Sequence, residues 1–356
     1  MTLEVKPKMR MSKSYLSIMK ALVFLGPLLF FSCQSSEKLV HLKGRTMGTH
    51  YNVKFFSAEY DEALKEDIDA LLVSINQQMS TYVKSSEISY FNEFNRLGWL
   101  KISPEFFQVT KYALELAQKT QGKYDPTIGP LVNLWGFGPK GDRKIPKPEK
   151  VKKALMIVGH DKLLMNDKNL EIKKKVPGVY LDLSSLAKGY GVDAVAEALR
   201  KKGIKNFMVE IGGEVRTAGH KADHSPWAIA IEAPNPEVNG GPYQKILKLK
   251  NTALATSGNY RNFFESESKR FSHTIDPKTG RPVMHTLASV SVVDESCMKA
   301  DALATALMAM GPDEGYTFAS QNKIAAYFVY GEDSQSDRKF VTKETDEFTK
   351  AFKDEL

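Results

Sequence analysis

Cysteine is almost absent from this chain, because its 356 residues contain only Cys33 and Cys297. A framework of disulfides is therefore excluded, and a folded domain must be stabilised by the packing of its core. The sequence also has no internal repeat and no low-complexity tract. The Gly-x-Gly-x-x-Gly fingerprint of Rossmann domains and the P-loop motif are both missing, so a nucleotide would have to bind in another way.

The balance of charge argues against one large class of partner. Net charge is +8, and residues 1–32 contribute +4 of it. The mild excess that is left does not predict nucleic-acid binding, for which a clustered basic stripe is typical. We therefore expect no nucleic-acid partner, and the excess suits a small anionic ligand. Hydrophobic residues make up 42% and charged residues 26%, as in ordinary globular domains.

The N-terminal segment has the pattern of an export signal. Basic residues end at Lys20, and twelve largely apolar residues follow at 21–32. This run is too short to span a bilayer as a helix but suits the apolar region of a secretory signal. Residues 29–33, Leu-Phe-Phe-Ser-Cys, resemble a bacterial lipobox, in which the cysteine is lipidated and becomes the first mature residue.

From this pattern we predict a signal peptide over residues 1–32 and a lipidated cysteine with a polar tether over residues 33–43. Cys33 is the predicted lipidation site, and an ordinary signal peptide or a retained anchor stays open as the alternative. The lipobox indicates a protein anchored by lipid to the bacterial inner membrane and facing the periplasm. Cys297 lies in an apolar stretch and is expected to be a buried thiol.

Strand and helix patterns are mixed without a regular alternation, which predicts an α+β (mixed α/β) class. One domain is expected over residues 44–356, and a division into two lobes stays open. Helices are predicted at 61–79, 103–120, 184–200, 297–310 and 346–356. Strands are predicted at 44–56, 179–183, 206–211, 227–231, 253–255, 287–293 and 323–330. A glycine- and aromatic-rich loop is expected at 124–138, and a solvated basic excursion at 139–153.

Several short stretches carry polar residues or glycines where a plain core would not need them. Gly212 and Gly213 follow an apolar strand, where they form either a tight turn or a place for a ligand to approach the backbone. Asp301 and Thr305 lie four residues apart on a predicted helix and would share one face. Their oxygens suit a hard cation such as Mg²⁺, although an aspartate near a helix start is also favoured by the helix dipole.

Two further stretches can likewise be explained either by local structure or by the binding of a ligand. Residues 182–189 place an acid and a lysine around the start of a predicted helix. Ser184 or Ser185 could cap that helix, or its exposed amides and Lys188 could bind an anion. His273 stands beside an Asp-Pro turn and could act as a base or be purely structural.

Taken together, these stretches resemble the ApbE family over about residues 44–330. The segments that carry the resemblance follow the family's order: Thr-Met-Gly-Thr-His-Tyr at 46–51, Met-Ser-Thr-Tyr at 79–82, residues 86–92, residues 124–138, Asp-Leu-Ser-Ser-Leu-Ala-Lys-Gly at 182–189, Ile-Gly-Gly-Glu at 211–214, residues 255–260, His-Thr-Ile-Asp-Pro-Lys-Thr-Gly at 273–280 and Ala-Asp-Ala-Leu-Ala-Thr-Ala at 300–306. One such motif is weak evidence, whereas the ordered set is specific.

The resemblance implies roles for individual residues. The side chains of Asp301 and Thr305 and the main-chain carbonyl of Ser185 would bind Mg²⁺. His273 matches a histidine that would deprotonate an acceptor threonine. The positions that would line a site for FAD, with Tyr82 over the flavin ring, are Met47, Tyr82, Lys123, Tyr124, Asp125, Asp182, Lys188 and Ile275.

The activity that the resemblance implies is Mg²⁺-dependent transfer of FMN from FAD to a threonine hydroxyl of another protein, with release of AMP. The implied acceptors are exported subunits of membrane redox complexes, such as sodium-pumping NADH:quinone reductase and its Rnf relatives. Two other functions stay open. One is an FAD pyrophosphatase, which uses water in place of threonine, although the family's hydrolases often differ at the position of Tyr82. The other is a non-catalytic flavin-binding lipoprotein.

Overall fold

The structure is a computed structural model that describes residues 37–139, 141, 143–234, 243–259, 263–266, 269–331 and 340–353. The predicted signal peptide and Cys33 lie outside the described residues. Within these ranges, no helix is both long enough and apolar enough to cross a bilayer.

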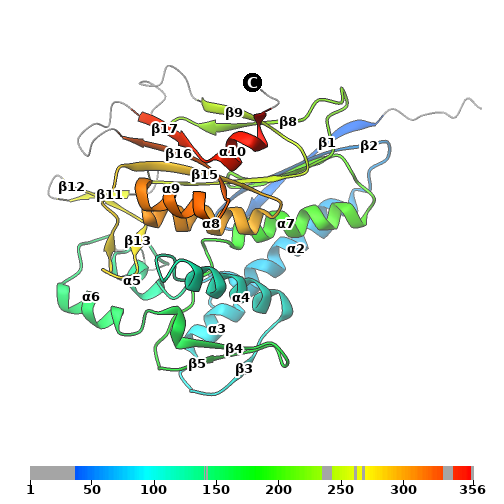
Figure 1. Cartoon of the computed structure of the whole chain (residues 1–356). Coiled ribbons are helices and arrows are strands. Elements are labelled where there is room, and N and C mark those ends of the chain that lie inside the picture. Colours follow the sequence, from blue (N-terminus) through cyan, green and yellow to red (C-terminus); the bar gives the residue numbers. More distant parts are fainter. Residues whose placement is uncertain are drawn as a thin grey trace, which may run out of the picture.

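An antiparallel sheet of eight strands forms the centre of the fold (Figure 1). All neighbouring strands pair antiparallel, with a register shift between Leu287 and Ser289 where β15 meets β16, and β1 and β2 form a hairpin closed by the turn at Met47 and Gly48. In spatial order, the strands are β1 (Lys38–Thr46), β2 (Thr49–Ser57), β6 (Phe207–Ile211), β7 (Glu214–Ala218), β10 (Ala253–Gly258), β15 (Leu287–Asp294), β16 (Ala325–Gly331) and β17 (Phe340–Glu344).

The two faces of the sheet are covered differently (Figure 1). The helices α2 (Ala63–Met79), α7 (Ala187–Lys201) and α8 (Cys297–Met310) cover one face, and α9 (Pro312–Gln321) follows α8. The hairpin of β8 (Trp227–Glu232) and β9 (Tyr243–Leu249) and the helix α10 (Asp346–Ala351) lie on the other face. Both faces are therefore buried, which explains why most side chains of β15 are buried along its length.

The remaining elements lie beyond the helical layer, on the side away from the sheet (Figure 1). These elements are α3 (Glu87–Glu93), β3 (Leu100–Lys101), α4 (Pro104–Lys119), α5 (Gly129–Leu134), α6 (Pro148–Leu155), the 3₁₀ helix η2 (His160–Lys162), β4 (Leu163–Asn166) and β5 (Glu171–Lys174). Most of them share the main hydrophobic core, which continues from β6 through α7 into α4, whereas α5 and α6 pack in a separate cluster around Leu131 and Trp135. Two short hairpins, β11 (Phe263–Ser266) with β12 (Lys269–Ser272) and β13 (Ile275–Asp276) with β14 (Arg281–Pro282), complete the described part.

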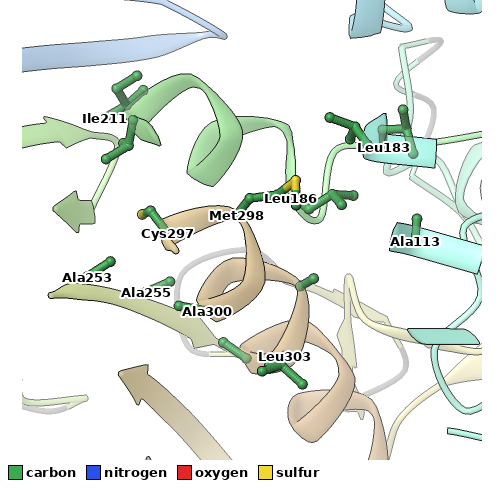
Figure 2. Close-up of a cluster of buried hydrophobic side chains, with 14 of the residues drawn as sticks. Ala113, Leu183, Leu186, Ile211, Ala253, Ala255, Cys297, Met298, Ala300 and Leu303 are labelled. Carbon is green, nitrogen blue, oxygen red and sulfur yellow. The ribbon is translucent and has the colours of Figure 1, made fainter. Parts of the chain in front are cut away.

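Small side chains allow α7, α8 and the sheet to pack closely. Figure 2 shows Ala253 and Ala255 of β10 beside Cys297 and Ala300 of α8, all of them buried. Cys297 is a free thiol with no exposed surface, as predicted, and burial raises its pKa. The helix therefore approaches β10 through a layer of small residues, which brings the polar residues of α8 close to the sheet.

The α+β class is confirmed, and the bounds of α8 agree with the sequence prediction. The helices predicted at 61–79 and 103–120 correspond to α2 and α4, and the strands at 206–211, 227–231, 253–255 and 287–293 correspond to β6, β8, β10 and β15. The terminal helix predicted from residue 346 is α10 within its described residues. In α2, for example, the buried apolar residues recur every three or four positions.

Other local predictions were wrong. Strand β1 begins at Lys38, so residues 38–43 belong to the sheet edge, although a polar tether was predicted there. The segment 179–183 is not paired as a strand, because the amide of Leu181 donates to the side chain of Asn92 instead of to a neighbouring strand. The predicted loop at 124–138 contains α5, the basic segment at 139–153 runs into α6, and β17 follows the strand predicted as the last one.

The start of α7 also differs from its prediction. Its N-cap residue is Leu186, and no side chain caps it. Ser184 hydrogen-bonds the carboxylate of Asp182, and the hydroxyl of Ser185 lies 2.8 Å from the Tyr124 hydroxyl. Neither serine caps the helix, because both hydroxyls are engaged elsewhere.

Candidate active site

One cavity of about 540 Å³ gathers nearly all of the residues that the sequence predicted for the site. It opens between the helical layer, the ends of the sheet strands and the segments around 124 and 275. The predicted residues that line it are Tyr82, Lys123, Tyr124, Asp125, Asp182, Ser185, Lys188, His273, Ile275, Asp301 and Thr305. Met47 is not among the lining residues; it occupies a left-handed turn with φ of 50° and contacts the core near Gly191.

A buried cluster of three charges stands at one end of this cavity. The ammonium of Lys188 lies 3.2 Å from a carboxylate oxygen of Glu214 and 3.7 Å from one of Asp301. Both carboxylates are about 95% buried. The cluster sets two carboxyl groups against one ammonium group in a region of low dielectric, so one carboxyl group lacks a cationic partner of its own.

Burial is the main influence on these ionisations. Desolvation raises the pKa of Asp301, and Lys188 opposes this rise. Desolvation also raises the pKa of Glu214, and the neighbouring charge of Asp301 raises it further, while Lys188 lowers it. Desolvation would lower the pKa of Lys188, but its two carboxylate partners outweigh that effect and raise the pKa overall. The cluster is therefore short of positive charge.

Glu214 is a site residue that the sequence-based prediction missed. It was present in the Gly-Gly-Glu motif, which predicted only backbone flexibility or a close approach to a ligand. One of its carboxylate oxygens is buried without a hydrogen-bond partner in the described part of the chain. An unsatisfied buried carboxylate oxygen is costly, so it is a reason to expect a ligand beside it.

The glycines before Glu214 have the backbone conformation that their motif suggested. Gly212 has φ of 61° and Gly213 has φ of 107°, values that favour glycine. They form the turn from β6 to β7 that lines the cavity, and the amide of Gly213 donates to Glu210. The glycine pair thus turns the chain so that Glu214 enters the cavity wall.

Asp301 and Thr305 lie on α8 one turn apart and both line the cavity, as their spacing predicted. The amide of Gly189 donates to one carboxylate oxygen of Asp301 at 3.0 Å. The Thr305 hydroxyl lies 3.3 Å from that of Ser257 on β10, a second lining residue that the sequence-based prediction did not single out. Oxygen atoms of several kinds therefore converge at this end of the cavity.

These residues fit a hard cation such as Mg²⁺. Such ions prefer oxygen ligands from carboxylates, hydroxyls and carbonyls. Within the described ranges, no three His, Cys, Asp or Glu side chains gather as ligands of one metal ion. A cation here would therefore need Asp301 together with neutral oxygens, such as the Thr305 hydroxyl and the carbonyl of Ser185. The excess of carboxyl groups over cationic groups in the cluster and the unsatisfied oxygen of Glu214 both favour such a cation.

Hydrogen bonds hold Tyr124 and Asp125 in fixed positions in the cavity wall. Tyr124 is buried, which raises the pKa of its hydroxyl, and this hydroxyl is within hydrogen-bonding distance of Ser185. The carboxylate of Asp125 accepts hydrogen bonds from the amide and hydroxyl of Thr127 and from the amide of His160. Asp125 therefore holds the loop at 124–128 against the turn at His160.

The other predicted residues lie around the cavity opening. The side chain of Tyr82 is 65% exposed, so a bound ligand could cover its ring, and burial with the nearby Asp182 raises the pKa of its hydroxyl. Lys123 forms an ion pair with Glu314 at 2.7 Å. The ring of His273 packs edge-on against Phe137, with their centres 6.3 Å apart. An exposed aromatic ring therefore stands in the lining of the cavity, where a flat ligand could stack on it.

Together, the antiparallel sheet, the helical layer and the cavity with its charged end define an α+β enzyme domain with space for a nucleotide. The ApbE family model matches residues 47–328, and the chain belongs to this family. The resemblance noted in the sequence is thereby confirmed.

The relatives agree in name and in extent. A protein named FAD:protein FMN transferase from Haemophilus influenzae is 42% identical over 90% of this chain and 93% of its own length. One of the same name from Vibrio cholerae is 44% identical over 85% of this chain and 90% of its own length. The solved flavin transferase ApbE from Vibrio cholerae superposes with a TM-score of 0.81 at 42% identity, covering 88% of this chain and 99% of that chain.

Proposed function

We propose that this chain transfers FMN from FAD to a threonine hydroxyl of an acceptor protein and releases AMP. The observation that carries the proposal is the set of relatives named FAD:protein FMN transferase, which are 42–44% identical over most of the chain. The cavity supports it, because its volume of about 540 Å³ lies within the range typical of small-molecule sites.

In the reaction, one bond forms and one bond breaks at the FMN phosphorus of FAD. The threonine oxygen attacks this phosphorus and forms a phosphoester, while the bond to the AMP oxygen breaks. The proton of the hydroxyl must pass to a base, because an alcohol is a weak nucleophile at neutral pH. AMP leaves with the electron pair of the broken bond, so the exchange is balanced without a further reactant.

We assign Asp301, Thr305 and the main-chain carbonyl of Ser185 as the residues that would hold Mg²⁺. When bound, the ion would neutralise the charge on the pyrophosphate oxygens and stabilise the departing AMP. Lys188 supplies a fixed positive charge in the same wall and would orient the diphosphate. Tyr82 at the cavity opening would stack on the flavin ring and exclude water from the reacting phosphorus.

We assign His273 as the base that accepts the threonine proton, since it lines the same cavity. Replacing it with alanine is expected to slow FMN transfer about 100-fold, the usual contribution of a general base. FAD affinity should change little, because the flavin and diphosphate contacts remain. The rate of FMN transfer would be measured in single turnovers, and FAD affinity would be measured by fluorescence. A collapse of FAD affinity with unchanged single-turnover transfer would contradict the role of His273 as the base.

The reaction products distinguish FMN transfer from hydrolysis of FAD and from flavin binding without catalysis. The full-length chain in detergent would be incubated with FAD, Mg²⁺ and an acceptor protein that carries an exported threonine site. The proposal predicts AMP release only when acceptor is present. AMP together with an equal amount of free FMN and no need for acceptor would indicate a pyrophosphatase. FAD binding without any AMP would indicate a non-catalytic flavin-binding protein.

We further propose that Cys33 carries a lipid that anchors the chain to the bacterial inner membrane, facing the periplasm. This location would hold the cavity near exported acceptor subunits of membrane redox complexes, such as sodium-pumping NADH:quinone reductase or Rnf-type complexes. The lipobox pattern at 29–33 supports the anchor.

The anchor can be tested by replacing Cys33 with alanine. The altered chain should lose its lipid and move from the membrane fraction to the soluble periplasmic fraction, because one lipidated cysteine is the only predicted attachment. Fractionation and labelling with a radioactive fatty acid would measure this. Cys297→Ala is the matched control and should leave labelling unchanged. Continued membrane association of an unlabelled Cys33→Ala chain would count against the lipid anchor.

A further inference from the structure

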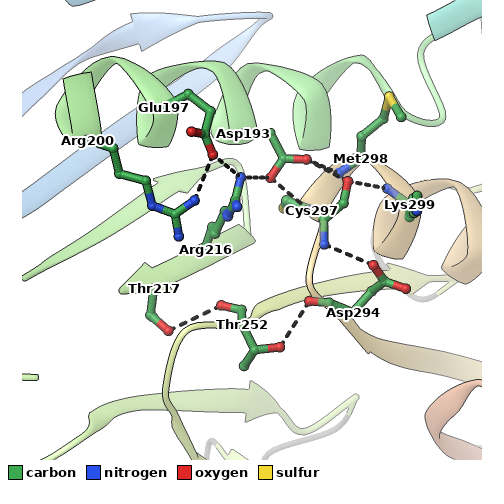
Figure 3. Close-up of polar contacts among 11 residues, drawn as sticks. Asp193, Glu197, Arg200, Arg216, Thr217, Thr252, Asp294, Cys297, Met298 and Lys299 are labelled. Carbon is green, nitrogen blue, oxygen red and sulfur yellow. Dashed lines mark hydrogen bonds and ion pairs between the residues drawn. The ribbon is translucent and has the colours of Figure 1, made fainter. Parts of the chain in front are cut away.

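The start of α8 is held by a side chain from another helix. The carboxylate of Asp193 on α7 accepts hydrogen bonds from the amides of Cys297 at 3.0 Å and Met298 at 3.1 Å (Figure 3). It also accepts one from the hydroxyl of Ser296 at 2.7 Å. The first amides of a helix have no partner within the helix, so this carboxylate satisfies two of them and complements the helix dipole.

The rest of the network keeps this carboxylate in place. Arg216 on β7 pairs with Asp193 at 2.9 Å and with Glu197 at 3.2 Å (Figure 3). Ser296, the N-cap residue of α8, also accepts a hydrogen bond from the amide of Lys299. Asp193 is therefore joined to a strand of the sheet and to the first turn of α8 at the same time.

These contacts fix the register between two antiparallel helices. Asp193 contacts Cys297, and Gly189, one turn earlier on α7, donates its amide to Asp301, one turn later on α8. Thr305 lies one further turn along α8, and Ser185 lies just before Leu186, the N-cap residue of α7; both line the cavity. The Asp193 contacts thus set the register that brings Asp301 and Thr305 of α8 beside the start of α7.

We propose that Asp193 is a positioning residue that sets the register of α7 and α8 and so assembles the metal site about two turns away. It does not line the cavity and acts only through the helices. The proposal rests on the proposed Mg²⁺-dependent function. Residues that support metal ligands in this way commonly change metal affinity by roughly 10- to 100-fold when they are altered.

The test measures Mn²⁺ binding, with Mn²⁺ in place of Mg²⁺, by electron paramagnetic resonance on the full-length chain in detergent. Asp193→Asn keeps the shape of the side chain but directs an amide donor at groups that need an acceptor. We expect its Mn²⁺ affinity to fall about tenfold, and added Mg²⁺ to restore its AMP release. Asp313→Asn is the control, because Asp313 is an exposed aspartate in the first turn of α9 and is not part of the network around Asp193.

The outcomes separate this proposal from a merely structural role. Asp193→Asn with a lower melting temperature but the Mn²⁺ affinity of the unaltered chain would overturn it. If Asp193→Asn does not fold, Ser296→Ala decides: a smaller loss of affinity supports the proposal, and an unchanged affinity overturns it. An unaltered chain that binds no Mn²⁺ would overturn the proposed metal site and this proposal together, whereas equal binding by all variants would overturn this proposal alone.

Discussion

Replacing Asp301 with asparagine is expected to lower the rate of FMN transfer about 1,000-fold, a loss of roughly 4 kcal/mol of transition-state stabilisation. Asparagine keeps an oxygen that can accept the hydrogen bond from the amide of Gly189. It removes the negative charge, because Asp301 supplies the only carboxylate among the three groups assigned to Mg²⁺. The fold should therefore persist while the cation is lost.

The stability of the Asp301→Asn chain should stay the same or increase slightly. Burial raises the pKa of Asp301, which means that its charged form is costly where it stands. Lys188 keeps Glu214 as a partner at 3.2 Å after the change. Thermal unfolding, AMP release and Mn²⁺ binding would be measured together, with the exposed Asp313→Asn on α9 as the control. Transfer at the unaltered rate in saturating Mg²⁺ would remove Asp301 from the metal site.

Gly189→Ala is expected to cause a large loss of stability. A Cβ atom at Gly189 would lie 2.4 Å from the carbonyl oxygen of Cys297 and 2.8 Å from the Cα atom of Met298. Both are backbone atoms of α8, so they cannot rotate away. The two helices must separate, and we expect the free energy of unfolding to fall by about 2–3 kcal/mol, as for overpacked cores.

The same displacement should also reduce activity. The amide of Gly189 donates to Asp301, so moving α7 away from α8 disturbs the carboxylate that is assigned to the cation. Chemical denaturation and transfer rates would be measured beside Gly98→Ala, where no atom lies within 4 Å of the added Cβ. A Gly189→Ala chain as stable as the Gly98→Ala chain would mean that α7 and α8 are not packed as closely as described.

Local sequence patterns were sufficient for the helix that carries Asp301 and Thr305. The small and apolar residues of α8 predicted its bounds, and the spacing of Asp301 and Thr305 predicted that they share a face. The Gly-Gly turn before Glu214 was likewise identified from residue types alone, and its positive φ values agree. In these places the local pattern and the tertiary environment favour the same structure.

Predictions failed where distant contacts decide the conformation. The segment 179–183 has the apolar alternation of a strand, but Asn92 on α3 binds both the amide and the carbonyl of Leu181 and takes the place of a neighbouring strand. Ser184 and Ser185 resemble helix caps, yet Asp182 and Tyr124 engage their hydroxyls. Asn92 and Tyr124 lie 89 and 61 residues away from Leu181 and Ser185, so a short motif does not reveal these contacts.

Distant contacts also decide the roles of three polar residues in or near the site, namely Glu214, Ser257 and Asp193. Each belongs to a segment that the sequence-based analysis noted or predicted as regular structure, but their partners are Lys188, Thr305 and the amides of α8. Those partners lie 26, 48 and about 100 residues away along the chain. Only the folded arrangement shows that these polar groups meet.

The most direct test of the account is the mass of an acceptor protein after reaction. The full-length chain in detergent would be mixed with FAD, Mg²⁺ and an acceptor with one exported threonine site, and a threonine-to-valine acceptor would be the control. The account predicts a mass gain equal to one FMN group on the threonine acceptor, with an equal amount of AMP, and no gain in EDTA or on the valine acceptor. Release of AMP and free FMN without any change in acceptor mass would contradict it.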